Sequence, residues 1–267
     1  MNPADPVLAA ATQRLAAAGC VAAGAEAQAF ISAAPDTSTL DAWLTRREEG
    51  EPPAWILGTV TFCGHLVHVA PGVYVPRPQT EELARRAAAL LPERGRALDL
   101  CTGAGAIAAH LRAEVPTATV IGVDRDARAA VSARRNGVPT VIGDLAEGLR
   151  DSPRFDLVTA VAPYVPTDAI RLLPADVQRH EPRRALDGGP DGLDLARRVV
   201  IAAGRLLRPG GWLLLEVGGD QDQVLARSLA AAGFDSTTVW HDDDGDLRGL
   251  ACRAVSSSSP TPSPGSV

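Results

Sequence analysis

The sequence predicts a doubly wound, Rossmann-like α/β domain, preceded by a small helical domain and a β-hairpin linker. Short apolar strands are expected to alternate with helices, beginning near residues 96, 119, 139, 156 and 212. The strand at 96–100 also runs into a turn of small residues that carries Gly103 and Gly105 and opens a helix. Open sheets built from such units bind ligands at the carboxyl ends of their strands.

The first fifty residues predict a helical domain. Residues 6–48 alternate Ala-rich, helix-periodic segments with breaks at glycine and proline. Ser38 or Thr39 is expected to cap a helix that ends at Glu49. We therefore place the helical domain at residues 1–50.

A change of apolar period marks the linker. From Trp55 to Val75 the period becomes two, with glycines and a Pro-Gly pair between the apolar residues, which is typical of a hairpin. The linker is expected to span 51–78, and a helix is expected from Thr80 to Leu91. The α/β domain then spans 79–255.

The chain is expected to close with a hairpin and a tail. Thr237 to Trp240 and Arg248 to Ala254 read as two strands, and the Ser- and Pro-rich segment 256–267 predicts disorder.

Composition excludes several classes of protein. A net charge of −6 and a pI near 5.4 argue against a sequence-independent nucleic-acid binder, which needs a basic surface. The chain contains no run of eighteen apolar residues that would span a membrane. The four cysteines form no C-x-x-C pair, which favours a reducing cytoplasm, and the five histidines show no spacing typical of a metal site.

The first predicted strands indicate a nucleoside site. One strand ends in Asp99 and leads into the turn with Gly103 and Gly105, and the next apolar strand ends in Asp124. An acidic side chain at this spacing accepts hydrogen bonds from ribose hydroxyls. The alternative is that the glycines only permit close packing of a helix.

The turn is not that of a dinucleotide-binding protein. A phosphate-binding turn reads G-x-G-x-x-G, whereas position 101 is Cys and position 106 is Ala. A nicotinamide dehydrogenase is therefore disfavoured. The pattern D-x-C-T-G-A-G fits S-adenosylmethionine better.

A second candidate segment follows the strand predicted near residue 156. This strand runs directly into Val161, Ala162, Pro163 and Tyr164, beside the expected nucleoside site. The simplest interpretation is a tight turn with Tyr164 as core filler. Its position favours a role in the reaction: a rigid Pro163 fixes the direction of the backbone carbonyls, and Tyr164 offers a ring face for a planar group.

These motifs resemble the protein-(glutamine-N5) methyltransferases of the HemK/PrmC type, which methylate a glutamine of peptide chain release factors. The resemblance extends over roughly residues 50–254. The matching segments include Trp55–Gly58, Val75–Glu81, Asp99–Ile107, Gly122–Asp124, Arg134–Asn136, Gly143–Leu145, Pro163–Tyr164, His180–Pro182, Ala185–Gly189, Pro209–Gly211 and Asp246–Arg248.

The resemblance implies a class I S-adenosylmethionine-dependent methyltransferase whose helical domain recognises the substrate. It implies cofactor contacts from Asp99, Cys101, Thr102, Gly103, Gly105, Asp124, Arg125, Asp144, Leu145 and Val161. It implies a catalytic segment formed by Val161, Ala162, Pro163 and Tyr164. Around these, Arg77, Thr80, Glu81 and Glu181 would brace the domain junction. The alternative for Thr80 is a helix cap, and for Arg77 a pair with an exposed carboxylate.

The chain departs from the family in its catalytic segment, which reads V-A-P-Y in place of N-P-P-Y. In the family, the Asn side chain and the next carbonyl hold the glutamine amide. Val161 offers no hydrogen bond, so a buried amide would lose a partner at roughly 1 to 3 kcal/mol. A loss of that size in the transition state slows transfer by about tenfold to a few hundredfold. Ala162 still supplies a carbonyl, and Cys101 for Gly and Gln79 for Glu are mild changes.

Three functions remain open from the sequence. The first is methylation of a protein glutamine, with a release factor as partner. The second is a methyltransferase of the same fold that acts on a nitrogen or oxygen of a small molecule or peptide and does not need the Asn. The third is a cofactor-binding pseudoenzyme. An adenine-specific DNA methyltransferase is disfavoured, because it would also need the Asn and a basic face. Glu216 and Glu181 are the carboxylates expected nearest the site.

Overall fold

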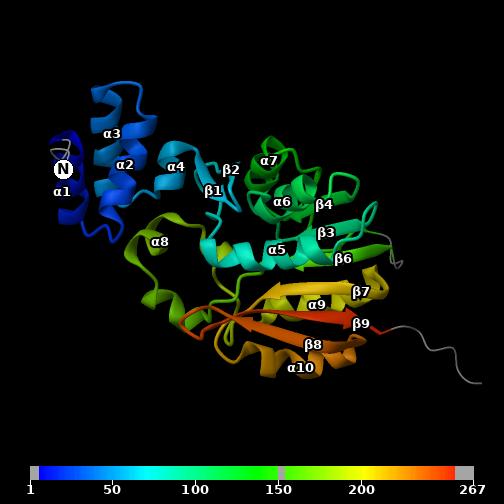
Figure 1. The fold of residues 1–267 in the computed structure, drawn as a ribbon. Helices are drawn as coiled ribbons and strands as arrows, with labels where there is room; N and C mark the ends of the chain where they lie inside the picture. Colours follow the sequence, from blue (N-terminus) through cyan, green and yellow to red (C-terminus); the bar gives the residue numbers. More distant parts are fainter. Residues whose placement is uncertain (1–5, 150–153, 256–267) are drawn as a thin grey trace, which may run out of the picture.

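The computed structural model describes residues 6–149 and 154–255, so the tail predicted at 256–267 lies outside the described residues. The described strands after the linker form one sheet in the order β5-β4-β3-β6-β7-β9-β8 (Figure 1). Its strands are β3 (Arg96–Leu100), β4 (Thr119–Asp124), β5 (Thr140–Ile142), β6 (Phe155–Ala160), β7 (Leu207–Glu216), β8 (Phe234–His241) and β9 (Leu247–Ala254).

The sheet confirms the predicted α/β fold. Strands β5, β4, β3, β6 and β7 are parallel, whereas β9 runs antiparallel to both β7 and β8. The antiparallel pair is the predicted closing hairpin, although its strands are longer than the sequence indicated. The strand order reverses between β3 and β6, and in open sheets a ligand crevice lies at such a switch point.

Helices cover both faces of the sheet (Figure 1). One core holds apolar residues of α5, α6 and α7, and the other holds those of α9 and α10. The bounds of these helices are α5 (Glu81–Leu90), α6 (Ala106–Glu114), α7 (Ala127–Arg135), α9 (Asp194–Leu206) and α10 (Gln221–Ala231). The central strands β3 and β6 are the most buried: all of β3 except Arg96 is buried, and every residue of β6 is buried.

The N-terminal helices have a core of their own. The helices α1 (Pro6–Ala17), α2 (Ala23–Ala33) and α3 (Thr37–Glu48) pack around Leu15, Phe30 and other apolar residues. The predicted cap of α3 at Ser38 or Thr39 is wrong. Asp36 caps the helix, because its extended backbone lets the side chain accept a hydrogen bond from the Thr39 N–H at 2.7 Å.

The two strands of the linker cover fewer residues than the sequence predicts. The short helix α4 (Pro53–Leu57) precedes the two-stranded hairpin of β1 (Thr59–Phe62) and β2 (His65–His68). Trp55 belongs to α4, where the Nε1–H of its ring donates to the Val73 carbonyl at 3.0 Å. The 3₁₀ turn η1 (Pro78–Thr80) then leads into α5. The domain boundaries placed at 50, 78 and 255 stay a prediction.

The connection between β6 and α9 reaches back to the N-terminal helices. It contains η2 (Thr167–Leu172), α8 (Ala175–His180) and η3 (Arg183–Ala185). An Arg47 guanidinium nitrogen on α3 lies 3.5 Å from the Asp176 carboxylate on α8, and Figure 1 shows α8 below the N-terminal helices. Among the described residues, no helix is both long and apolar enough to cross a membrane.

Candidate active site

A cavity of about 810 Å³ opens at the carboxyl ends of β3, β4, β6 and β7. Its wall includes the turn after β3, the V-A-P-Y segment after β6, and Glu216 at the end of β7. It continues past Arg77 to the connection between α1 and α2, where Cys20 and Val21 line it. The cavity therefore joins the predicted nucleoside site, the predicted catalytic segment and the N-terminal helices.

The two glycines of the turn have different roles. Gly103 has φ +55°, and a Cβ built on it meets nothing within 4 Å, so its backbone faces open space in the cavity. Gly105 has φ +81°, and a Cβ there would lie 2.9 Å from the Cβ of Ala133 on α7. Gly105 therefore permits close helix packing, whereas the backbone at Gly103 stays open to the cavity. The contact of this turn with a nucleoside stays a prediction.

Asp124 is held in place by backbone donors. Its Oδ2 accepts a hydrogen bond from the Gly103 N–H at 2.8 Å, and its Oδ1 accepts one from the Asp126 N–H at 2.9 Å. Burial raises the pKa of the Asp124 carboxyl, and the two backbone donors oppose that rise. Each oxygen keeps a lone pair, so the side chain can still accept bonds from a ribose.

Asp99 supports the turn from beneath. It is buried, and its carboxylate accepts hydrogen bonds from the hydroxyls of Thr102 at 2.6 Å and Thr159 at 2.7 Å. Burial raises the pKa of Asp99 to about 6, against the lowering effect of the two hydroxyls. The turn is also tied to the neighbouring strand, since the Thr102 N–H donates to the Val123 carbonyl at 3.0 Å.

Cys101 lines the cavity in a strained conformation. Its φ is +56°, in the left-handed region that a side chain disfavours. This is the position where the family motif has glycine, so the substitution is less mild than the sequence suggests. Arg125 also lines the cavity, directly after Asp124.

Asp144 and Leu145 are not among the residues that line the cavity. The Asp144 carboxylate forms an ion pair with Arg198 of α9 at 2.9 Å, and Leu145 is buried with φ +52°. Their contact with an adenine ring stays a prediction.

Sequence reasoning missed an ion pair at the rim of the cavity. Arg184 on η3 pairs with Asp126, the residue whose N–H holds Asp124, and both line the cavity. Asp126 also caps α7, because its side chain accepts from the Arg128 N–H at 3.0 Å. No spacing in the sequence relates Arg184 to Asp126, since they lie 58 residues apart.

The V-A-P-Y segment lies against the cavity, as the sequence predicts. Its backbone is tightly packed: a Cβ on Gly188 would lie 2.6 Å from the Pro163 carbonyl oxygen, and one on Gly192 would lie 2.3 Å from that of Tyr164. The Tyr164 carbonyl also accepts a hydrogen bond from the Gln221 side chain at 2.9 Å. The segment is therefore held rigidly, with half-buried Val161 at its start.

Glu216 supplies a buried carboxylate to this wall. The Thr80 hydroxyl donates to its Oε2 at 2.6 Å, and Tyr164 is a second hydrogen-bond partner. Burial raises the pKa of Glu216, and these two hydroxyls oppose that rise. The alternative in which Thr80 caps a helix is wrong, because its side chain makes no cap hydrogen bond.

Of the other residues predicted to brace the domain junction, Arg77 lines the cavity and pairs with Glu181, whereas Glu81 lies outside the cavity. Arg77 lines the cavity, lies 5.1 Å from the ring centre of Tyr74 and pairs with Glu181. Glu181 is buried rather than exposed, so the alternative for Arg77 is also wrong. Glu81 is not among the cavity residues; it accepts a hydrogen bond from the Cys63 N–H at 3.0 Å and ties the hairpin to α5.

The residues of the turn after β3 and the carboxylate of Asp124 fit S-adenosylmethionine. The open backbone at Gly103 would leave room for its nucleoside, and the Asp124 carboxylate would accept hydrogen bonds from its ribose; both contacts stay predictions. Asp99 and Thr102 hold the turn in that shape.

Comparisons with known proteins show the family of this chain. A family described as a methyltransferase domain matches residues 97–180. The release factor glutamine methyltransferase of Geobacter sulfurreducens is 39% identical over 208 residues, which is 76% of this chain and 73% of that protein. The chain belongs to the release factor glutamine methyltransferase family. It is an S-adenosylmethionine-dependent methyltransferase with the class I fold of this family.

Two further matches matter for the acceptor. A Streptomyces pristinaespiralis protein named 4-amino-L-phenylalanine/4-methylamino-L-phenylalanine methyltransferase is 38% identical and covers 83% of this chain and 80% of its own length. The solved Mtq2–Trm112 complex of E. cuniculi, described as responsible for methylation of the eRF1 translation termination factor, matches with a TM-score of 0.52 at 25% identity. That match covers 68% of this chain and 99% of the solved chain.

Proposed function

We propose that this enzyme methylates the side-chain amide nitrogen of a glutamine in a peptide chain release factor. The observation that carries the proposal is the continuity of the cavity, which runs from the Gly103 turn past V-A-P-Y to the N-terminal helices. A protein loop can enter such a cavity between the helices and the sheet. The relatives named release factor glutamine methyltransferases support the same acceptor.

S-adenosylmethionine supplies the methyl group from its sulfonium centre. In the transfer, a nitrogen–carbon bond forms as the sulfur–carbon bond breaks, and the nitrogen releases one proton. The chain contributes orientation, because the backbone after Ala162 is tightly packed at Pro163 and Tyr164 and holds Ala162 at the cavity wall, where its carbonyl can fix the acceptor. Glu216 is a buried carboxylate on the same wall and is the group placed to accept the proton.

Val161 favours a second candidate acceptor, the amino group of a small aromatic molecule. An arylamine keeps its lone pair more available than an amide does, so it does not need the amide clamp that Asn provides in the family. Both tyrosines of the chain, Tyr74 and Tyr164, line the cavity and offer ring faces to such a molecule. The Streptomyces pristinaespiralis relative is named for an acceptor of this kind.

A two-acceptor assay separates the candidates. Transfer of radiolabelled methyl from S-adenosylmethionine is measured to purified release factor and to 4-amino-L-phenylalanine, for the natural chain and for Val161→Asn. Labelling of release factor by the natural chain supports the first proposal, and labelling of only the arylamine supports the second. If both proteins bind cofactor and neither acceptor is labelled, both proposals fail, and other small-molecule and peptide acceptors are then assayed.

The proposal places the enzyme in the cytoplasm. The basis is the sequence: Cys20, Cys63, Cys101 and Cys252 form no C-x-x-C pair, which favours a reducing compartment.

A further inference from the structure

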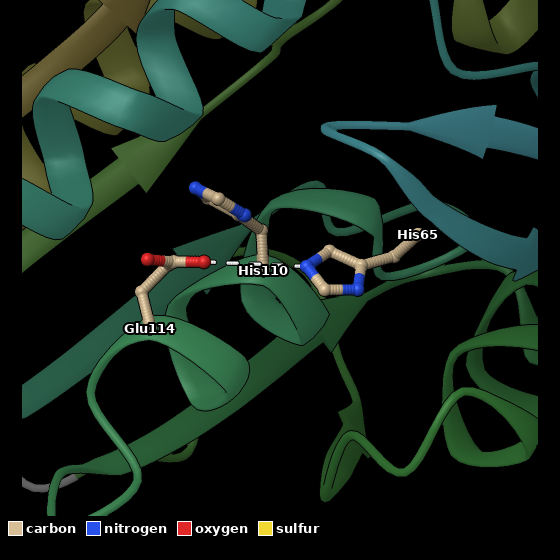
Figure 2. A group of neighbouring side chains, drawn as sticks. All are labelled: His65, His110 and Glu114. Carbon is tan, nitrogen blue, oxygen red and sulfur yellow. Dashed lines mark ion pairs between the residues drawn. The ribbon is translucent and has the colours of Figure 1, made fainter.

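Three side chains outside the active cavity converge between the hairpin and helix α6. His65 begins strand β2, while His110 and Glu114 lie one turn apart on α6 and therefore share a face of that helix. Figure 2 shows the Glu114 carboxylate and the His65 ring directed toward each other. His110 lies between these two residues. The sequence concealed this group, because His65 is 45 residues from His110 along the chain.

The distances suit a metal ion. Each residue offers one ligand atom, and the three atoms all lie within 4.8 Å of one another. The Nε2 atom of His65 and the Oε1 atom of Glu114 are 4.0 Å apart. Bonds of about 2.0 to 2.2 Å around a tetrahedral Zn²⁺ need a slightly closer approach. His65 and Glu114 have half-exposed side chains, so rotation about their χ angles can supply it.

An unpaired buried nitrogen of His110 is a second observation that points to a bound ion. His110 is only 6% exposed, and its Nδ1 atom is buried with no hydrogen-bond partner. Leaving a buried polar atom unpaired is unfavourable, and such atoms in native proteins call for an explanation.

The surroundings leave room for the ion and for a water ligand. A surface hollow of about 560 Å³ is lined by His110 and Glu114 together with Cys63, Glu81 and Arg85. The guanidinium of Arg85 is occupied by Glu81 at 3.1 Å and by Glu82 at 3.4 Å, so its charge is largely compensated. None of the three converging residues lines the active cavity.

We propose that His65, His110 and Glu114 form a Zn²⁺ site that fastens the hairpin to helix α6. Two imidazoles and one carboxylate suit Zn²⁺, whereas Mg²⁺ and Ca²⁺ prefer oxygen ligands alone. Helix α6 begins directly after the Gly103–Gly105 turn, so the ion ties the linker to the helix that carries the cofactor turn. Its role is structural and is separate from methyl transfer.

Isothermal titration calorimetry with zinc chloride tests the site. The full chain is first treated with a chelator, and the natural protein is compared with His65→Ala, Glu114→Gln and the control His241→Ala. His65, Glu114 and His241 are exposed, so all three variants should fold, which circular dichroism verifies. We expect one equivalent of Zn²⁺ to bind, with affinity at least about tenfold weaker in each site variant and unchanged in the control.

Three results would overturn the proposal, two from calorimetry and one from spectroscopy. The calorimetric results are an absence of zinc binding by the natural chain and equal affinity in the natural chain and in either site variant. Cobalt substitution adds a spectroscopic check, because a thiolate ligand gives an intense charge-transfer band. Such a band, lost in Cys63→Ser, would show that Cys63 binds the ion in place of the proposed set.

Discussion

The Asp124 carboxylate accepts a hydrogen bond from the Gly103 N–H at 2.8 Å, which joins the end of β4 to the turn after β3. The Asp126 N–H holds the second oxygen, so the side chain is oriented before any ligand arrives. Rigid acceptors lose little entropy when they bind ribose hydroxyls.

Asp124→Ala should therefore weaken binding of S-adenosylmethionine by about tenfold to a hundredfold, since hydrogen bonds to a charged group contribute about 1.5 to 3 kcal/mol. Calorimetric titration of the cofactor measures this change. The control is Asp243→Ala, which removes an exposed carboxylate from the loop between β8 and β9. Equal cofactor affinity in the natural chain and the Asp124 variant would contradict the assignment.

The substitutions Gly103→Ala and Gly105→Ala test the separate roles of the two glycines. Gly103→Ala adds a methyl group where nothing lies within 4 Å, so it should weaken cofactor binding while unfolding free energy falls by only about 1 kcal/mol. Gly105→Ala places its Cβ 2.9 Å from Ala133 and should destabilise the fold by more, on the order of 2 to 3 kcal/mol. Urea unfolding and cofactor titration of both variants check this division of roles.

Cys101→Gly should stabilise the protein by about 1 kcal/mol, because glycine adopts the observed φ of +56° without a steric penalty. The gain in unfolding free energy is measured by urea denaturation. Cys20→Gly serves as a control that removes a thiol elsewhere. A loss of stability in Cys101→Gly would show that packing of the thiol outweighs the backbone strain.

The raised pKa of Asp99 predicts that the stability of the fold decreases as pH rises. The pKa of Asp99 is about 6 in the folded protein and near 3.8 in an unfolded chain, so the folded state holds the proton more tightly. Its contribution to stability is complete below the unfolded pKa and is lost as pH rises through the folded pKa. That loss is on the order of 3 kcal/mol between about pH 4 and pH 7.

Asp99→Asn removes this titration. Urea unfolding measures the free energy of unfolding of both proteins. Between about pH 4 and pH 7 that free energy should fall in the natural chain relative to the variant. A constant difference between the two proteins would mean that the pKa of Asp99 is the same in both states.

Much of the fold follows from the sequence. The strands near 96, 119, 139, 156 and 212 all occur, because the parallel strands of such a sheet are short apolar runs bounded by polar residues or glycine. The cap of α3 was misplaced, since Ser38, Thr39 and Asp36 are all capable caps and only the backbone conformation selects one.

The site was predictable where it lies close to a strand end. Asp99, Gly103, Asp124 and Val161 to Tyr164 line the cavity because each lies at, or within four residues of, the carboxyl end of a central strand. The pairs Arg184–Asp126 and Arg77–Glu181 and the group of His65, His110 and Glu114 depend on how distant segments pack. Local periodicity contains no information about such contacts.

The most direct test of the proposed acceptor is mass spectrometry of release factor after incubation with the enzyme and S-adenosylmethionine. The account predicts a gain of one methyl group on a glutamine, which is absent without cofactor and reduced with the Asp124→Ala variant at limiting cofactor. The gain should be larger with Val161→Asn. An unmodified glutamine after incubation with both the natural enzyme and Val161→Asn, while both proteins bind cofactor, would contradict it.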